Sequence, residues 1–344
     1  MTVRGLITMI AIMSKNHEIL AVTCLLLLLG GCGAPTGWLL TPVPVNQELE
    51  ETVLMEDGGW GAVGKIAVVD VDGLLMNRRG GGLFGADENP VSLFVEKVDK
   101  VAQDHAVKAV IVRINSPGGG VTPSDIMYQR LITLRKRRGV PVVAIIEDIG
   151  ASGGYYVACG AERILAHPTS IVGSIGVLVQ TMSFARTMQM LGIEAKAVVS
   201  GPYKDMASPL KPLEEKDLKV LQHLTNTYYK RFVGIVQKAR PKLTAEQVRS
   251  LADGRIFSAQ DAEANGLVDG LGYMEAAVGL ARQLGGIRRA RVVIYHRPLG
   301  YRANVYSAAP TPPQINLVNI SVPGLLDVGR PRFLYLWNGG GSGR

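Results

Sequence analysis

A serine flanked by small residues is the first position in this sequence that could catalyse a reaction. Ser152 lies in the run GASGG, residues 150–154, which follows the apolar run of residues 141–146. A serine at a turn from a strand to a helix exposes its hydroxyl as a nucleophile, and small neighbours leave room for a substrate. The same position also suits a serine that only caps a helix. Catalysis therefore requires a second group that accepts the hydroxyl proton.

The sequence offers two kinds of base for this serine. Of the five histidines, none lies in a loop at the end of a predicted strand with an aspartate beside it. Lys204 lies in the loop of residues 200–205, after a predicted strand at residues 195–199. A lysine accepts a proton only if burial or a neighbouring charge lowers its pKa from about 10.4 to about 7–8. Without such surroundings Lys204 would be a solvated surface charge.

A second glycine-rich segment could stabilise negative charge. The run NSPGGG, residues 115–120, follows the apolar run of residues 107–114. Glycines at the end of a strand let the backbone approach a ligand closely and leave N–H groups unobstructed. Such N–H groups can stabilise the oxyanion of an acyl-transfer reaction. A tight turn without a ligand is the alternative interpretation.

Several short strands and helices must position these segments. Short runs rich in β-branched residues predict strands at residues 65–71, 107–114, 141–146 and 195–199, with helical patterns between them and a long amphipathic helix after residue 212. Buried apolar strands that alternate with helices predict βαβ crossovers and a mainly parallel sheet. We therefore expect an α/β fold in which both glycine-rich segments follow strands of one sheet.

The N-terminal residues have the pattern of a secretion signal. The apolar run of residues 19–29 follows Arg4 and Lys15 and is shorter than the roughly 20 residues of a transmembrane helix. Leu29-Gly30-Gly31-Cys32 resembles the lipobox of bacterial lipoproteins, in which the cysteine is lipidated. An ordinary signal peptide with a chance cysteine is the alternative. The sequence predicts a lipid-anchored protein on the extracytoplasmic side of a cell membrane.

Four regions follow from these patterns. We predict a lipoprotein-type signal peptide at residues 1–31, a tether at 32–60, a peptidase domain at 61–287 and an irregular C-terminal extension at 288–344. An apolar strip at residues 333–337 lies in that extension.

The composition excludes several classes of protein. The chain has 344 residues, 47% of them hydrophobic and 19% charged, which rules out a disordered chain. The formal net charge of +8 comes from scattered residues, so we expect no nucleic-acid partner. Three distant cysteines form neither a disulfide framework nor a metal-ligand cluster, and we expect no metal and no cofactor.

Taken in order, the motifs resemble the signal peptide peptidase A family of serine proteases, family S49, of the short single-repeat type. The resemblance spans about residues 65–284. It depends on five segments: NSPGGG (115–120), GASGGYY (150–156), IVGSIGV (171–177), GPYK (201–204), and DGR (253–255) with GLVD (266–269).

The resemblance implies a ClpP/crotonase-like α/β fold and a Ser–Lys dyad. It assigns the nucleophile to Ser152 and the general base to Lys204. It also implies a ring-shaped homo-oligomer, in which the dyad forms either within one protomer or between neighbouring protomers. The N–H of Gly153 and that of Gly118 or Gly119 would stabilise the oxyanion. The implied substrates are signal-peptide remnants and other apolar peptides at the membrane.

Two further residues have expected roles. Ser174 could hydrogen-bond the Lys204 amine, although a simple turn hydroxyl is the alternative. Cys159 is expected to be an inert thiol of the core. The lipobox replaces the N-terminal transmembrane helix that many relatives use, which changes the tether and leaves the dyad unchanged.

Three rival functions remain open at the level of the sequence. An esterase would use Ser152 with a histidine and an aspartate, and a crotonase-like acyl-CoA enzyme would not need Lys204. A lipid-anchored scaffold or assembly protein on the same fold would have no proteolytic activity.

Overall fold

A computed structural model of the chain describes residues 48–58, 63–77, 81–82, 85–86, 88–298 and 332–337. Its helices and strands are β1 (Glu50–Glu56), β2 (Val63–Leu75), β3 (Gly81–Gly82), β4 (Gly85–Ala86), α2 (Pro90–Gln103), β5 (Val107–Gly120), α3 (Val121–Arg138), β6 (Val142–Ala151), α4 (Gly153–Ala158), β7 (Arg163–Ala166), β8 (Ile171–Gly173), β9 (Leu178–Gln180), α5 (Ala185–Met190), α6 (Glu215–Ala239), α7 (Ala245–Leu251), β10 (Ile256–Ser258), α8 (Ala259–Ala264), β11 (Gly270–Leu271), α9 (Met274–Leu284), β12 (Arg289–His296) and β13 (Arg332–Leu336).

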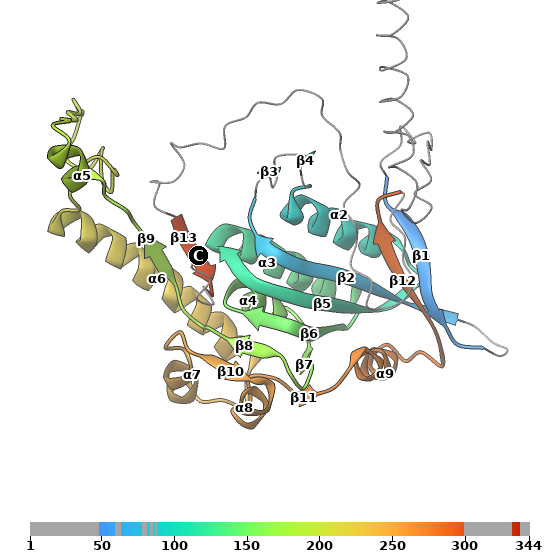
Figure 1. The fold of residues 1–344 in the computed structure, drawn as a ribbon. Helices are drawn as coiled ribbons and strands as arrows, with labels where there is room; N and C mark the ends of the chain where they lie inside the picture. Colours follow the sequence, from blue (N-terminus) through green and yellow to red (C-terminus); the bar gives the residue numbers. More distant parts are fainter. Residues whose placement is uncertain are drawn as a thin grey trace, which may run out of the picture. The chain divides into compact units, whose positions relative to one another are not determined.

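One large sheet organises the molecule (Figure 1). Its main strand order is β1-β12-β2-β5-β6-β7-β11. Along this path every neighbouring pair from β12 to β11 is parallel, and β1 runs antiparallel to β12. Off the path, β13 pairs antiparallel with β5 and β9, and β10 pairs antiparallel with β8. The prediction of an α/β fold with a mainly parallel sheet and βαβ crossovers is confirmed.

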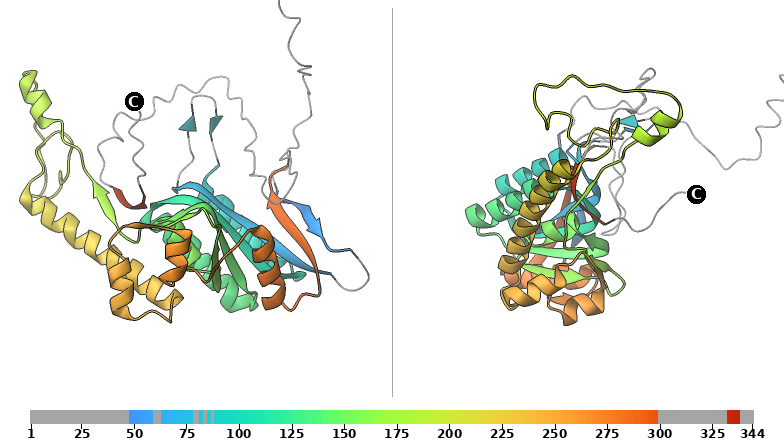
Figure 2. Two further views of the ribbon diagram at one scale, coloured as in Figure 1. Left: turned by 60° about the horizontal axis from the view of Figure 1, so that its bottom comes forward. Right: turned by 90° about the vertical axis from the view of Figure 1, so that its left-hand side faces the viewer.

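Helices cover both faces of this sheet (Figure 1, Figure 2). Successive side chains of a strand point to opposite faces. In β2, Ala67 and Val69 pack with buried residues of α2, α3 and α4, whereas Ile66 and Val68 pack with α9. Burial on both faces explains why the strands read as continuous apolar runs in the sequence.

Local sequence signals set the ends of the helices on one face. The Asn89 side chain accepts hydrogen bonds from the N–H groups of Val91 and Ser92 and so caps α2. Helix α3 ends in four basic residues, and Gly139 follows with φ of 62°. Glycine adopts this left-handed conformation without steric cost, and the basic turn complements the helix dipole.

The long amphipathic helix is present as α6, and its second half packs on the main core, where Phe232 and Val236 are fully buried. In the first half, Asp217 and Leu221 are buried, whereas Leu218 in the first turn is 49% exposed. The side chains that α6 contributes to the main core therefore lie toward its C-terminus.

The predicted strand at residues 195–199 is wrong. These residues have no regular structure and are all exposed, and Val198 is fully exposed. A β-branched run becomes a buried strand only where another strand pairs with it. None of the described strands pairs with residues 195–199, so the loop that carries Lys204 does not leave the sheet.

The predicted boundaries at both ends also need correction. Strand β1 lies in the predicted tether, and β12 lies in the predicted irregular extension. The two strands pair with each other, Thr52 opposite Ile294, and β12 also pairs with β2. The sheet therefore extends beyond residues 61–287 in both directions. Among the described residues, no helix is long and apolar enough to span a bilayer.

Candidate active site

Ser152 lies on the turn between β6 and α4. Its backbone φ of 51° is in the left-handed region, which a residue with a side chain adopts only at a cost of about 1–3 kcal/mol. The residue is 1% exposed, and its N–H donates to the carbonyl of Gly173 at 2.7 Å. A serine held on a strained turn after a strand matches the position expected of a nucleophile.

The glycines around Ser152 are required by close backbone packing. A Cβ on Gly118 would lie 2.6 Å from the nitrogen of Gly153, and one on Gly154 would lie 2.6 Å from the carbonyl oxygen of Ser116. Gly118 also has φ of 102°, which disfavours a side chain. The two glycine-rich segments predicted from the sequence therefore meet in the fold.

The hydroxyl of Ser116 separates the roles of the two candidate oxyanion glycines. Ser116 Oγ accepts the N–H of Gly118 at 3.1 Å and donates to the carbonyl of Gly73 at 2.6 Å. The Gly118 N–H is thus already engaged within the protein. Of the two, Gly119 is the candidate donor beside Gly153, and it lies opposite Tyr335 of β13. The sequence analysis missed Ser116, although its place in NSPGGG could have drawn attention to it.

Ser174 directly follows the residue that accepts the hydrogen bond of the Ser152 N–H. Strand β8 pairs with β6 with Gly173 opposite Ala151, so Ser174 follows the residue that accepts the Ser152 N–H. Ser174 is buried, with φ of 50°, and its N–H donates to the carbonyl of Arg255 at 2.7 Å. The DGR motif thereby holds the turn that follows β8.

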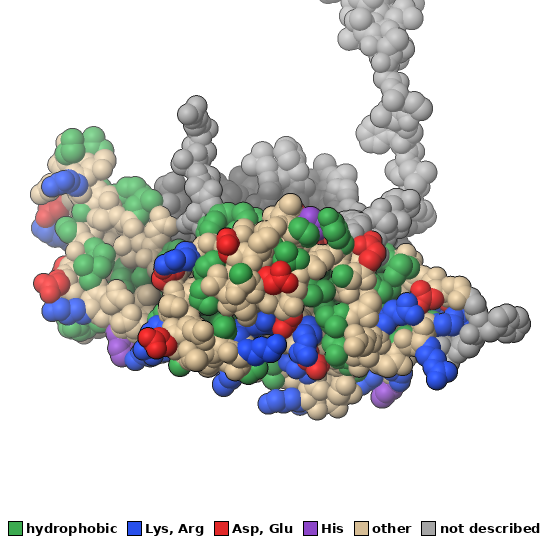
Figure 3. Space-filling model, turned by 90° about the horizontal axis from the view of Figure 1, so that it is seen from below, with side chains coloured by type: hydrophobic (Ala, Val, Ile, Leu, Met, Phe, Trp, Pro, Cys, Tyr) green, Lys and Arg blue, Asp and Glu red, His purple; other side chains and the backbone are tan. Residues whose placement is uncertain are grey.

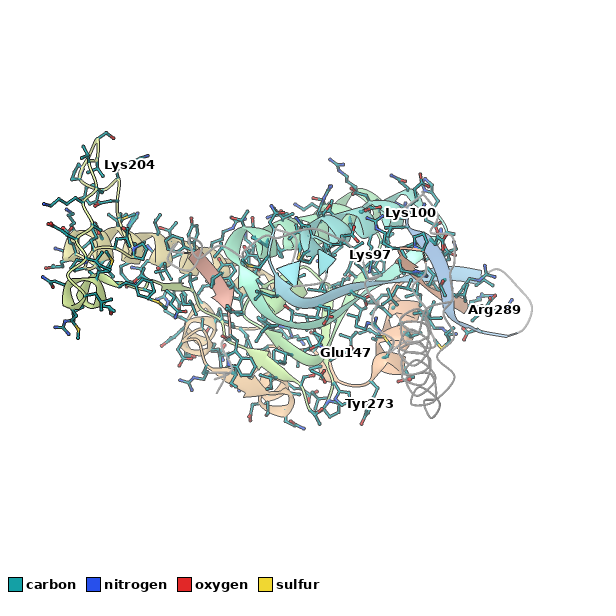
Figure 4. All side chains as sticks on the ribbon, turned by 45° about the horizontal axis from the view of Figure 1, so that its top comes forward. Lys97, Lys100, Glu147, Lys204, Tyr273 and Arg289 are labelled. Carbon is teal, nitrogen blue, oxygen red and sulfur yellow. The ribbon has the colours of Figure 1, made fainter. Side chains whose placement is uncertain are left out.

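Lys204 does not lie beside Ser152 within one chain. It is exposed on the turn of residues 201–204, where its N–H donates to the carbonyl of Gly201 at 3.1 Å. Figure 4 shows Lys204 on the outer part of the segment that carries α5, well away from the labelled Glu147 of β6. The predicted dyad is therefore not assembled by a single chain.

The segment around Lys204, residues 181–212, exposes many large hydrophobic side chains. Figure 3 shows hydrophobic side chains on the part of the surface that this segment forms, at the left of the view. Surfaces of this kind mark interaction sites. The exposed residues are Met182, Phe184, Met190, Leu191, Ile193, Val198, Val199, Tyr203 and Leu210.

Lys211 anchors this segment to the start of α6. Its amine donates to Asp205 at 2.9 Å and to Glu214 at 3.1 Å, and it lies 3.5 Å from the buried Asp217. These hydrogen bonds raise the pKa of Lys211, Asp205 contributing most. Lys211 therefore stays protonated and does not compete with Lys204 for the role of base.

Two of the described histidines have ring contacts away from Ser152. His167 Nδ1 lies 2.8 Å from Thr169 Oγ1, and the ring packs edge-on against Tyr273. His296 hydrogen-bonds Thr52 at 2.8 Å at the other end of the sheet. No hydrogen bond joins a described histidine to Ser152, so the Ser-His-Asp alternative gains no support.

Acidic residues gather at the carboxyl ends of β2 and β6. Partial burial raises the pKa of Glu147, since it disfavours the ionised carboxylate. Nearby, Arg113 Nη2 contacts Asp70 at 2.7 Å. The structure brings together no group of three or more His, Cys, Asp or Glu residues suited to a metal ion within its described part.

The structure tests the expectation for Cys159 but not the one for Cys32. Cys159 is buried and unpaired, and burial raises the pKa of its thiol to about 12. This agrees with an inert core thiol. Cys32, the predicted lipidation site, lies outside the described residues, as do the other residues of the lipobox.

A buried serine on a strained strand-to-helix turn, beside glycine N–H groups, is the arrangement of a serine hydrolase. Comparison with known proteins narrows this class. Residues 134–288 match the family model of peptidase family S49. The chain is 33% identical over 250 residues to a putative signal peptide peptidase SppA of Enterococcus faecium, which covers 73% of this chain and 71% of that protein. The chain belongs to peptidase family S49.

Other relatives carry the names of proteases. A putative protease of Methanocaldococcus jannaschii is 35% identical over 218 residues, 63% of this chain and 69% of that protein. Protease 4 of Salmonella typhi is 33% identical over 233 residues, 67% of this chain and 36% of that protein. The predicted family, ClpP-like fold class and serine peptidase class are confirmed.

Proposed function

We propose that this serine peptidase is a membrane-anchored endopeptidase that cleaves signal-peptide remnants or other apolar peptides. Ser152 acts as nucleophile and Lys204 of a neighbouring subunit acts as general base. The observation that carries the proposal is the position of Ser152, which is fixed on a strained turn beside glycine N–H groups. The name of the Enterococcus relative supports signal peptides as the substrate class.

In the proposed reaction, Ser152 Oγ attacks the carbonyl carbon of a peptide bond while the neutral amine of Lys204 takes the hydroxyl proton. The N–H groups of Gly153 and Gly119 stabilise the oxyanion, and removal of one such donor typically costs 10²–10³ in rate. Protonated Lys204 then gives the proton to the leaving amine. Lys204 next activates water, which hydrolyses the ester on Ser152.

A dyad between subunits is supported by the surface that carries Lys204. The exposed apolar residues around Lys204 would be buried if this segment docked on a second copy of the chain. In a ring, each subunit can offer its segment to the next one. We therefore propose a ring-shaped homo-oligomer in which docking brings Lys204 to the Ser152 turn of the neighbour and Ser174 hydrogen-bonds the amine.

Mixing two inactive variants tests both the Ser152–Lys204 dyad and its formation between subunits. Ser152→Ala and Lys204→Ala should each abolish hydrolysis of an apolar fluorogenic peptide, and Ser152→Ala should also lose labelling by a fluorophosphonate. If the dyad forms between subunits, a mixture with subunit exchange should recover roughly a quarter of the wild-type sites. Lys216→Ala is the control lysine of α6 and should stay active. Full activity of Lys204→Ala would refute the proposed base.

The membrane anchor is proposed from the lipobox and has a separate test. Wild-type protein expressed in bacteria should fractionate with membranes and carry acyl chains on Cys32. Cys32→Ser should leave the membrane fraction, because acyl chains supply most of the binding free energy. Retention of the variant in the membrane would show that another part of the chain anchors the protein.

A further inference from the structure

A single amine, that of Lys211, joins the segment that carries Lys204 to the start of α6. It donates to Asp205 Oδ1 at 2.9 Å and to Glu214 Oε1 at 3.1 Å. The carboxylate of Asp217, in the first turn of α6, lies 3.5 Å from the same amine. Asp205 directly follows Lys204, so Lys211 is attached to the chain one residue from the proposed base.

Asp217 is the carboxylate that most requires this amine. Its side chain is fully buried, and neither carboxylate oxygen has a hydrogen-bond partner among the described residues. Within that part of the chain, Lys211 is the only residue that forms an ion pair with Asp217. A buried carboxylate is costly unless a cation compensates its charge. Asp217 therefore holds the Lys211 amine in the position from which it also reaches Asp205.

The turn that carries Lys204 is built by short-range hydrogen bonds. The N–H of Lys204 donates to the carbonyl of Gly201 at 3.1 Å. The N–H of Ser208 donates to the carbonyl of Asp205 at 3.0 Å. Ala207 is 3% exposed and has φ of 54°, a conformation that a residue with a side chain keeps only where its surroundings impose it. The fold therefore fixes the backbone on the C-terminal side of Lys204.

The backbone of Lys211 is fastened as well as its amine. The hydroxyl of Ser183 donates to the carbonyl of Lys211 at 2.8 Å. The N–H of Phe184 donates to the carbonyl of Pro209 at 2.7 Å. Lys204, by contrast, is exposed on the outer part of the segment (Figure 4). The proposed base thus lies at the surface, on a turn that is held in place from its inner side.

We propose that Lys211 is a positioning residue for the proposed base Lys204. Its amine, held between Asp205 and Asp217, fixes the turn of residues 201–208 before the segment docks on the neighbouring subunit. A catalytic group that is already in place loses little entropy when the site assembles, and a displacement of about 1 Å costs roughly a hundredfold in rate. The inference rests on the proposed function, because it takes Lys204 as the general base.

Placing a variant on one side of a mixed site tests this role. In a mixture of Ser152→Ala and Lys204→Ala chains, the base of every active site comes from the Ser152→Ala subunit. Lys211→Met on that subunit should lower kcat of the mixture about tenfold or more, with little change in KM. The same substitution on the Lys204→Ala chain should have no effect, because that chain supplies no base. Equal losses from both placements would reveal a general defect and overturn the proposal.

Three further variants separate positioning from the compensation of buried charge. Lys211→Arg keeps the charge and should restore most of the rate, and Lys219→Met, which removes the exposed partner of Glu215, should change nothing. Lys211→Met combined with Asp217→Asn removes both charges of the buried pair, so its stability in urea should recover. Its kcat should stay low, because no amine holds Asp205. Recovery of kcat together with stability would overturn the proposal. The double variant also serves if Lys211→Met alone does not fold.

Hydrogen exchange tests the fixed turn without any reaction. The N–H groups of Met206 and Ser208 donate within the turn, and they should exchange about tenfold or more faster in Lys211→Met chains but not in Lys219→Met chains. Equal exchange in both variants would overturn the proposal even in an active enzyme. Faster exchange in a protein whose wild type cleaves no peptide would support the role of Lys211 in the turn and refute the proposed peptidase mechanism.

Discussion

The N–H of Ser152 donates a 2.7 Å hydrogen bond to the carbonyl of Gly173. This bond ties the turn of Ser152, the proposed nucleophile, at the end of β6 to the end of β8, and Ser174 follows directly. Gly173 itself has φ of 102°, and a Cβ there would lie 2.7 Å from the ring of Phe257. The geometry of Ser152 therefore depends on a glycine outside its own motif.

Gly173→Ala should lower kcat about 10–100-fold, because a small displacement of a catalytic group costs that much in rate. KM should change less than kcat, because the substitution displaces the turn of Ser152. Steady-state kinetics with an apolar fluorogenic peptide would measure both constants. Gly279→Ala is the matched control in α9, where an added Cβ meets open space, and it should leave kcat unchanged.

Ser116→Ala should destabilise the fold by about 1–3 kcal/mol, because it removes the partner of the Gly118 N–H and of the Gly73 carbonyl. Urea denaturation would give the change in the free energy of unfolding. Ser92→Ala, on the outer side of the first turn of α2, should cost much less. A neutral effect of Ser116→Ala would mean that water replaces the hydroxyl.

Asp269 is expected to make the fold sensitive to acid. Burial alone would raise the pKa of its carboxyl, but the Arg240 guanidinium at 2.8 and 3.1 Å and the N–H of Ile164 lower it. Since the folded pKa lies below the unfolded one, the stabilisation is complete above about pH 4 and is lost as the pH falls through the folded pKa. Asp269→Asn should cost about 2–3 kcal/mol at pH 7.

The pH dependence distinguishes this pair from a general loss of packing. The difference in unfolding free energy between wild type and Asp269→Asn should shrink as the pH is lowered from 5 to 3, measured by urea denaturation at each pH. Asp253→Asn removes an exposed carboxylate beside Arg255 and should show little difference at any of these values. If the difference in unfolding free energy between wild type and Asp269→Asn stays constant from pH 5 to 3, the Asp269 carboxylate is not the source of the acid sensitivity.

Cys159 should resist alkylation in the folded protein, because its thiol is buried and its pKa is about 12. Iodoacetamide at pH 8 should modify it only after denaturation, as followed by mass spectrometry of the peptide that carries residue 159. Rapid modification of the native protein would reveal opening of the core around α4.

Much of the central fold was predictable from the sequence because its strands are buried on both faces. Continuous apolar runs at β2, β5 and β6 identify strands, and the glycines at the ends of β5 and β6 identify the segments that meet at Ser152. The apolar run at residues 195–199 led to a wrong strand prediction because its sequence pattern is the same as that of a buried strand. A β-branched run has the same pattern whether or not another strand pairs with it, and here the pattern belongs to an exposed surface.

The elements that the sequence analysis missed depend on contacts between distant parts of the chain. Strands β1 and β12 pair with Thr52 opposite Ile294, and the side chains of Thr52 and His296, 244 residues apart in the chain, hydrogen-bond to each other. No local pattern indicates such a partner. The apolar strip at residues 333–337 was visible, but its place between β5 and β9 was not. The location of Lys204 also depends on an exposed segment whose proposed partner is another copy of the chain.

Strand β12 lies between β1 and β2, although it follows them by more than two hundred residues in the chain. During synthesis, the edge of β2 therefore stays unpaired until residues 289–296 have left the ribosome. An open edge of this kind pairs readily with other chains. A chain that stops before residue 289 should therefore aggregate rather than form a smaller enzyme.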